Sequence, residues 1–217
     1  MRLLPETLPK SPLPLLNTWL EEAMQGAQSP NPNSMALATV SPEGKPSVRV
    51  VLCKELNVEK GYLVYYTNYR SAKAADIDCN PNAAISMHWD RKGRQVRVEG
   101  VLVKSPATES DAYFLSRDRD SRVGAWASAQ SVPIPSRQAL EEKFADAHKR
   151  FSGQDVKRPL HWGGYRLWFT SVELWISLES RLHDRARWER DVTICDVDSE
   201  SAEIKVSNWQ TIGRLQP

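Results

Sequence analysis

The 217-residue chain carries 29 Lys and Arg against 27 Asp and Glu, a net charge of +2 that excludes a protein built throughout to bind a polyanion. Its 41% hydrophobic residues are enough for a buried core in one large domain. No apolar run approaches the ~18 residues of a membrane-spanning helix, and the proline-rich N-terminus has no signal-peptide core, so we expect a cytoplasmic protein without a membrane partner.

Motifs for several common chemistries are absent. Three widely spaced cysteines without a C-x-x-C pair indicate reduced, structural thiols rather than a disulfide framework. Four scattered histidines give no support to a metal site or a Ser-His hydrolase. The glycine-rich signatures of dinucleotide and P-loop nucleotide sites are also missing.

The chain is expected to begin with a flexible arm at residues 1–11, followed by a helix. Leu16, Trp19 and Ala23 recur at helical spacing between the start signal Ser11-Pro12 and Gly26. Such a stripe of apolar residues is typical of a helix that packs on a core.

A β-hairpin should follow this helix. Met35–Val40 has the composition of a strand, and the turn residues 41–44 predict that it folds back onto Ser47–Lys54. Alternate residues of a strand face opposite sides. In the second strand one side therefore holds Arg49, Val51 and Cys53, and the other holds Val50, Leu52 and Lys54.

The next elements suggest a phosphate site. A strand at Tyr62–Thr67 runs into a short helix that Ser71 should cap and that extends through Ile77. Free backbone N–H groups at the helix start, together with Arg70 or Lys73, are suited to bind a phosphate. The alternative is a solvent-exposed loop with an incidental lysine.

The remaining chain alternates strands with helices. A charge run at 116–122 is usually a solvated face, and the stretch 192–207 is acidic and weakly patterned. The expected strands are Ala83–Trp89, Arg94–Lys104, Tyr165–Thr170, Val172–Ile176, Ala186–Arg190 and Trp209–Ile212; a helix beginning at Ser105-Pro106 carries Tyr113 and Phe114, and another runs from a Ser136 cap to Phe151.

A cationic strip lies near the C-terminus, at Ser180–Arg185. If this segment is extended, Arg181, His183 and Arg185 share one face, which is suited to hold an anion. The alternative is an edge strand that uses charges to block aggregation. The residues alone thus predict a mainly β, barrel-like α+β domain that binds a small phosphorylated molecule, with a nucleic-acid module as the runner-up for the arginine clusters.

Several blocks of the sequence, taken in order, resemble the pyridoxine/pyridoxamine 5′-phosphate oxidase family from about Pro12 to the final residue. The blocks are Arg49–Lys54, Tyr66–Asn68 with Ser71–Lys73, Arg94–Val96, Ser116–Ser121 with Gly124–Trp126 and Gln130–Ser131, Trp162–Gly164, Arg181–Arg185 and Arg214–Pro217.

The resemblance implies an FMN-binding split β-barrel, as a single domain at residues 12–217 whose part 162–217 completes the flavin and substrate site. It also implies a homodimer with FMN at the interface, no nucleic-acid partner, and oxidation of pyridoxamine or pyridoxine 5′-phosphate by O2 to pyridoxal 5′-phosphate and H2O2. Two alternatives stay open: a related flavin oxidase of the phenazine-pathway type, and a module that binds flavin or pyridoxal phosphate with little turnover.

The resemblance also assigns site residues, none of them to a metal. Arg181 and His183 match the catalytic pair that holds the pyridine ring. Positions matching the substrate site are Lys54, Tyr113, Arg117, Ser121, Arg181 and His183; those matching the FMN site are Arg49, Val50, Val51, Leu52, Cys53, Lys54, Tyr66, Thr67, Lys73, Gln95, Gln130, Ser131, Trp175 and Arg185.

The chemistry of these side chains agrees with their assigned roles. The protein must position the substrate against the flavin, and a cation such as Arg185 would favour the reduced, anionic flavin. His183 is expected to donate a hydrogen bond or to relay a proton. The chain departs from the family pattern at Ala72, where an arginine is usual, at Ile176-Ser177-Leu178, where Gln-Gly is usual, and at Asn31, where an acidic residue often precedes the proline.

Overall fold

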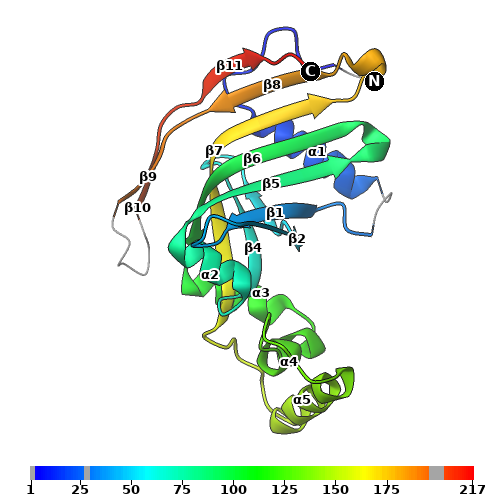
Figure 1. Cartoon of the computed structure of the whole chain (residues 1–217), viewed down its shortest axis with the longest axis vertical. Helices are drawn as coiled ribbons and strands as arrows, with labels where there is room; N and C mark the ends of the chain where they lie inside the picture. The colour runs from blue at the N-terminus through cyan, green and yellow to red at the C-terminus, as the bar shows by residue number, and fades with distance from the viewer. Residues whose placement is uncertain (1–2, 27–29, 196–202) are drawn as a thin grey trace.

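The computed structural model describes residues 3–26, 30–195 and 203–217 and shows a curled antiparallel sheet with flanking helices (Figure 1). Its main path runs in the order β11-β8-β7-β6-β5-β1-β2, and β4 pairs with β7 and β3. The strands of this nine-stranded sheet are β1 (Ser34–Val40), β2 (Pro46–Leu52), β3 (Glu55–Asn57), β4 (Tyr62–Asn68), β5 (Asn82–Trp89), β6 (Arg94–Lys104), β7 (Trp162–Ile176), β8 (Asp184–Glu189) and β11 (Gln210–Arg214). The expected mainly β fold class is confirmed.

Helices lie on one side and at one end of this sheet. Helix α1 (Leu13–Gln25) packs behind the central strands, while α4 and α5 lie beyond the end of the sheet (Figure 1). The other helices are α2 (Ala72–Cys79), α3 (Ala107–Ser116), α4 (Arg119–Ala127) and α5 (Arg137–Arg150), and a small second sheet is formed by β9 (Val192–Cys195) and β10 (Glu203–Val206). No helix in the described part of the chain is long and apolar enough to cross a membrane.

The main core lies between the sheet and helix α1, where the inward-facing apolar residues of the strands contact the apolar side of the helix. Met35 and Leu37 of β1 and Leu16 and Trp19 of α1 are all buried in one cluster. A second cluster, centred on Phe114 and Trp162, lies beneath α3 to α5. Burial of an aliphatic or aromatic side chain contributes roughly 1.5–3 kcal/mol, so these clusters hold the helices to the sheet.

The curl of the sheet depends on β6 and β7. The two strands pair along their length, with a bulge between Glu99 and Gly100. A β-bulge bends a strand and increases its twist. At Gly100 the backbone of β7 approaches so closely that a Cβ would collide with the carbonyl oxygen of Trp168. The bend therefore requires glycine here.

The opposite face of β1, β2 and β5 carries no helix among the described residues (Figure 1). Its side chains are small on the central strands, with Ala36 and Ala38 on β1 and Ser86 on β5. On the edge strand β2, Val48 and Val50 are 65% and 68% exposed. Small residues beside exposed valines make this open face suited to pack against another protein surface.

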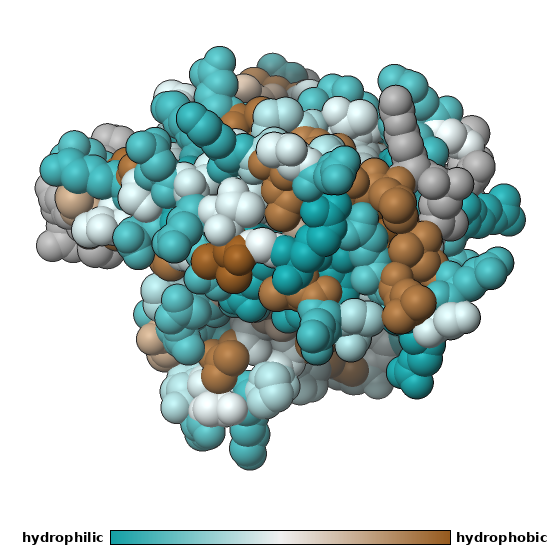
Figure 2. All heavy atoms as spheres, turned by 90° about the horizontal axis from the view of Figure 1, so that it is seen from above, coloured by the Kyte–Doolittle hydropathy of each residue, from teal (hydrophilic) through white to brown (hydrophobic). Residues whose placement is uncertain are grey.

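Two expectations differ from the structure at the end of the molecule where β8 and β11 lie. The surface there is mostly hydrophilic, with hydrophobic side chains between the polar ones (Figure 2). Residues 3–11, expected to form a flexible arm, are docked: the Leu4 amide donates to Asp184 at 2.8 Å, and Trp188 Nε1 donates to the Pro9 carbonyl at 2.8 Å. Pro5 and Pro9 have no N–H to donate, but their carbonyls accept hydrogen bonds from Arg214 and Trp188.

The second difference concerns the cationic strip, which is extended only in part. Glu179–Arg181 form a short 3-10 turn, and β8 begins at Asp184. The two strands expected at 165–170 and 172–176 are one continuous strand, β7. Part of the weakly patterned stretch 192–207 forms β9 and β10, and its residues 196–202 lie outside the described residues.

Replacing Gly100 tests the role of the bend. Gly100→Ala places a methyl group against the Trp168 carbonyl and should lower the free energy of unfolding by about 3 kcal/mol or more. Gly124→Ala, within helix α4, is the matched control, because a Cβ there meets only Phe144 of α5 at 3.5 Å. This variant should be more stable than wild type by about 0.5–1 kcal/mol. Urea unfolding of both variants measures the difference, and equal stabilities would contradict the prediction.

Candidate functional site

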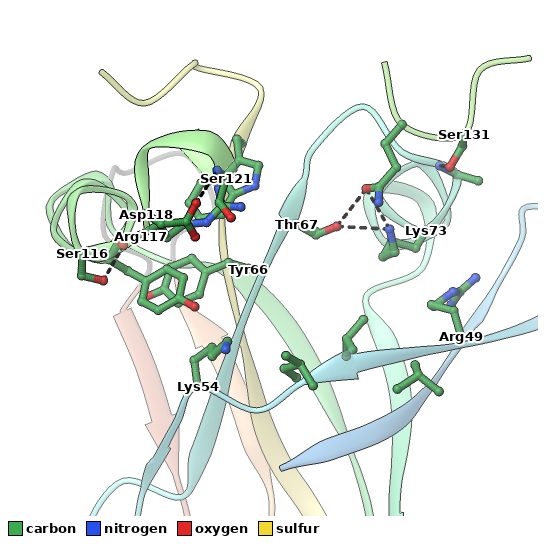
Figure 3. Close-up of a pocket in the computed structure, with 17 residues that line it drawn as sticks. Arg49, Lys54, Tyr66, Thr67, Lys73, Ser116, Arg117, Asp118, Ser121 and Ser131 are labelled. Atoms are coloured by element: carbon green, nitrogen blue, oxygen red, sulfur yellow. Dashed lines mark hydrogen bonds between the residues drawn. The ribbon is translucent and has the colours of Figure 1, made fainter. Parts of the chain in front are cut away.

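A cavity of about 810 Å³ opens between the end of β2, the start of α2 and the junction of α3 with α4 (Figure 3). Most of the residues matched to the flavin and substrate sites line it. The predicted residues that line the cavity are Arg49, Val50, Val51, Leu52, Lys54, Tyr66, Thr67, Lys73, Tyr113, Arg117, Ser121, Gln130 and Ser131. Segments as far apart in sequence as Arg49 and Trp162 thus meet at one place.

One end of the cavity is organised around Lys73, in the first turn of α2. Its ammonium group donates to Thr67 Oγ1 at 3.1 Å, Ser71 Oγ at 3.1 Å and Gln130 Oε1 at 3.2 Å, all neutral acceptors. Burial, with a smaller effect from the nearby Arg49 charge, lowers the pKa of Lys73 to about 8. Ser71 stands at the N-cap position as predicted, but its hydroxyl accepts from Lys73 and donates to Asn68 instead of capping the helix.

Arg49 lies near Lys73, and hydrogen bonds to residues of β1 and β2 fix its side chain. Its guanidinium donates to Thr39 Oγ1 at 2.6 Å and to Ser47 Oγ at 2.7 Å, with Asp76 3.7 Å away. The Ala72 amide donates to Ser131 Oγ at 3.1 Å, which joins the loop at 128–131 to the start of α2. Two cations, a hydroxyl and a helix N-terminus therefore converge at this end, an arrangement that favours a phosphate.

The other end holds a second group of cations at the α3–α4 junction. The Arg117 guanidinium stacks 4.7 Å from the Trp162 ring centroid, and Lys54 Nζ lies 5.9 Å from that of Tyr113. Arg117 Nη1 is buried and has no hydrogen-bond partner among the described residues, and burial lowers the pKa of Arg117. Asp118 caps α4 by accepting from the Ser121 amide at 2.8 Å. An anion bound here would satisfy the unpaired donor.

A stack of three aromatic rings stands beside this second group. The ring centroids of Tyr66 and Tyr113 are 3.9 Å apart with planes 10° from parallel, and Tyr66 and Trp162 are 5.5 Å apart at 9°. Gly164, opposite Tyr66 in the β4–β7 pairing, leaves room for this ring. Burial raises the pKa of Tyr66, which keeps it a neutral phenol. The stack offers a flat wall against which a planar ring can pack.

The remaining predicted residues lie elsewhere in the chain. Gln95 of β6 is the register partner of Trp175 on β7, and Trp175 is the partner of Arg185 on β8. The His183 ring packs on Trp175 with centroids 4.6 Å apart, and Arg181 lies exposed in the preceding turn. This second half-site, defined as Gln95, Trp175, Arg181, His183 and Arg185, does not line the cavity.

Arg185 is fixed by two partners. Its Nε and Nη2 donate to Glu173 Oε1 at 3.0 and 2.9 Å, and its Nη1 donates to the Gln216 carbonyl at 2.9 Å. Glu173 is only 5% exposed and also faces Arg97, with 3.4 Å between Nη1 and Oε2. The guanidinium is thus oriented by the fold before any ligand is present.

One assigned position, Cys53, and two positions that were not assigned, Arg70 and Trp162, complete the description of the site. Cys53, matched to the flavin site, is buried in the main core and does not line the cavity; burial raises the pKa of its thiol to about 12. Its side chain faces the core because residues 49, 51 and 53 share a side of the strand. Arg70, named with Lys73 as a possible phosphate ligand, is exposed and does not line the cavity. Trp162 does line it, although only its sequence block was noticed beforehand.

Comparison with known proteins places the chain. Residues 20–151 match the family model of pyridoxamine 5′-phosphate oxidase, and residues 162–217 match that of the pyridoxine 5′-phosphate oxidase C-terminal dimerisation region. The chain belongs to the pyridoxine/pyridoxamine 5′-phosphate oxidase family. This confirms the resemblance seen in the sequence blocks and makes the chain an oxidoreductase.

Relatives in this family match over most of the chain. A pyridoxine/pyridoxamine 5′-phosphate oxidase of Polynucleobacter asymbioticus is 47% identical over 187 residues, 85% of either chain. One of Burkholderia mallei strain SAVP1 is 48% identical over 207 residues, covering 95% of this chain and 89% of that protein.

Solved structures agree on the fold. PhzG from Burkholderia lata 383, in complex with tetrahydrophenazine-1-carboxylic acid, has a TM-score of 0.81 at 29% identity, over 96% of this chain and 94% of that one. A pyridoxamine 5′-phosphate oxidase-related, FMN-binding protein of Nostoc punctiforme has a TM-score of 0.65 at 18% identity, over 91% of this chain and 98% of that one. The split-barrel fold expected from the family is therefore confirmed.

The low pKa of Lys73 makes phosphate binding dependent on pH. The ammonium is charged below about pH 8 and loses its proton above it, so affinity for FMN, used as the probe phosphomonoester, should fall about tenfold per pH unit above 8. The second pKa of a phosphate, ~6, leaves the ligand charge constant over that range. Fluorescence titration of the FMN-free protein between pH 7 and 9.5 measures this.

Lys73→Met is the control for this titration. It should bind FMN more weakly at pH 7 and with little change up to pH 9.5, because the titrating group is gone. A wild-type affinity that stays flat to pH 9.5 would show that Lys73 does not contact the phosphate.

Proposed function

We propose that the chain is an FMN-dependent oxidase that converts pyridoxamine or pyridoxine 5′-phosphate to pyridoxal 5′-phosphate, with O2 reduced to H2O2. The observation that carries this proposal is the charge distribution of the cavity. Lys73 at one end, and Lys54 and Arg117 at the other, have no carboxylate within ion-pair distance among the described residues. An unpaired cation at one end and two at the other suit two phosphates, one of a cofactor and one of a substrate.

The residues of the cavity fit FMN. The phosphate would be held by Lys73, Arg49 and Ser131, whose donors converge at the start of α2. FMN, when bound, would supply the redox chemistry. The protein contributes orientation and charge: Arg117 and Lys54 hold the substrate phosphate, and the neighbouring ring stack excludes water from one side of the cavity.

The second half-site is proposed to come from a partner subunit. Within one chain Trp162, which lines the cavity, and Trp175 stand at opposite ends of β7, roughly 40 Å apart along an extended strand, so Trp175 and its neighbour Arg185 do not reach the cavity. The open face of small residues and exposed valines connects the two sites. A homodimer packed through that face would bring each second half-site to the cavity of the other copy, with FMN between them.

A second candidate reaction is supported by the likeness to PhzG, whose structure contains a tricyclic carboxylic acid. An oxidase acting on such a ring would not need the cations at the α3–α4 junction to bind a phosphate. Lys54 and Arg117 together match the charge of a phosphate, about −2, better than the single charge of a carboxylate, so they favour the phosphorylated substrate.

Peroxide formation tests the proposed reaction directly. Purified protein should carry about one FMN per chain, elute as a dimer, and release H2O2 and pyridoxal 5′-phosphate when pyridoxamine 5′-phosphate is added in air. Protein that binds FMN but forms no peroxide would instead be a binding module. Protein that does not bind FMN at all would contradict the proposal.

Phosphate selectivity tests the role of Arg117. A charge-assisted hydrogen bond contributes roughly 1.5–3 kcal/mol, so Arg117→Ala should lower kcat/KM for pyridoxamine 5′-phosphate by about 10- to 150-fold. Unphosphorylated pyridoxamine should be a poor substrate for both proteins and nearly indifferent to the change. The control is Arg119→Ala. Arg119 is an exposed arginine of the same charge run, and its guanidinium donates to the backbone carbonyls of residues 151 and 154 instead of lining the cavity. Equal losses on both substrates would contradict the assignment.

A further inference from the structure

The turn that carries His183 has an unusual backbone. After β7 ends at Ile176, Leu178 is extended, with φ −132° and ψ 161°. Ser180 and Arg181 then both have positive φ, 54° and 62°, in the left-handed region that non-glycine residues rarely occupy. Two such residues in succession persist only where surrounding contacts hold them, and strain of this kind gathers at functional sites.

The contacts that hold the turn meet at the His183 ring. The Leu178 amide donates to His183 Nδ1 at 3.2 Å, and the ring packs on Trp175 with planes 46° apart. The turn is closed further by the Leu182 amide, which donates to the Glu179 carbonyl at 3.1 Å, and by the Ser177 amide, which donates to the Gly93 carbonyl at 2.8 Å. The ring is thus fixed by one hydrogen bond and one packed face.

The bond from Leu178 determines which ring nitrogen carries the proton. A backbone N–H only donates, so Nδ1 must accept, and a neutral imidazole that accepts at Nδ1 has its hydrogen on Nε2. We propose that the Leu178 amide is a positioning group that holds His183 as the Nε2–H tautomer, so that His183 acts on the substrate as a hydrogen-bond donor through Nε2. This rests on the proposed function, in which His183 meets the substrate ring.

The proposal specifies what His183 contacts and what it does not do. The substrate atom facing Nε2 must be an acceptor, an oxygen or nitrogen of the ring system. Proton abstraction by Nδ1 is excluded, because its lone pair is occupied by the Leu178 amide. The Leu178 side chain takes no part in this hydrogen bond, so Leu178→Ala should leave the tautomer unchanged.

Nitrogen NMR of protein labelled with 15N-histidine reads the tautomer without any need for turnover. The chain has four histidines, and the two ring-nitrogen signals of His183 are identified as the pair that disappears in His183→Gln. In the FMN-loaded protein at a pH where His183 is neutral, its Nε2 should give the protonated-type signal and its Nδ1 the unprotonated type, in wild type and in Leu178→Ala alike. A protonated Nδ1 in wild type would overturn the proposal.

Two substitutions then separate the donor role from a structural one. The amide of His183→Gln reaches the Nε2 position and can still donate to the substrate. His183→Asn can accept from the Leu178 amide but places no atom at Nε2. With equal FMN content in both, kcat/KM for pyridoxamine 5′-phosphate should be about tenfold lower in His183→Asn than in His183→Gln.

The outcomes are distinct. Equal activity of the two variants, or higher activity in His183→Asn, would overturn the donor role of Nε2. If wild type bound FMN but oxidised no pyridoxamine 5′-phosphate, the proposed function would fail, and the donor role with it, while the NMR signals would still show whether His183 is the Nε2–H tautomer that the Leu178 bond requires.

Discussion

Strand β7 constrains the whole architecture because it pairs with three strands. Along one edge it pairs with β6, whereas its other edge is divided: residues 162–168 pair with β4 and residues 171–176 pair with β8. Two strands cannot occupy the same edge at the same place, so the sheet splits near Phe169 and Thr170. The bulge before Gly100 lets β6 follow the bend. One strand therefore contributes Trp162 to the cavity and Trp175 to the second half-site.

The cavity and the second half-site differ in whether their cations are paired with carboxylates. On β6 to β8, Arg185 shares the buried carboxylate of Glu173 with Arg97. Arg187 lies near Glu99 and Glu189. In the cavity, Lys73 and Arg117 are desolvated without such partners, which is why their pKa values are lowered. Leaving buried cations unpaired destabilises the free protein, and an anionic ligand removes that penalty. The contrast supports the proposal that phosphates bind in the cavity.

Much of this could be predicted from the sequence. The composition of the strands and the turn residues located the β1–β2 hairpin. The basic start of the helix after Tyr62–Thr67 indicated the end of the cavity that holds Lys73. The fold class followed from the number of short strands and from the family blocks. Strand alternation, turn residues and helix caps each depend on a few neighbouring residues, so they can be recognised in the sequence before the fold is known.

What could not be predicted depends on tertiary contacts. The prediction that all of Ser180–Arg185 is extended was wrong before Asp184, because contacts outside this segment shape the turn. Among them are the bond from the Ser177 amide to the Gly93 carbonyl and the packing of His183 on Trp175. The docked N-terminal arm depends on Trp188 and Asp184, about 180 residues away in the chain. Likewise, nothing near Trp162 in sequence indicates that its ring stacks with Tyr66 and Tyr113.

The second half-site is organised before it meets any ligand. Arg185 is held by Glu173 and the Gln216 carbonyl, and His183 by Trp175 and the Leu178 amide. Freezing a flexible side chain on binding costs roughly 0.5–1.5 kcal/mol, so side chains fixed in advance remove that cost from ligand binding. In the proposed dimer each subunit would offer its partner a rigid set of donors, while the cavity supplies the unpaired cations. In that arrangement the rigid donors would orient the ring, because orientation depends on fixed geometry. The unpaired cations would set how tightly the phosphates are held, because affinity depends on uncompensated charge.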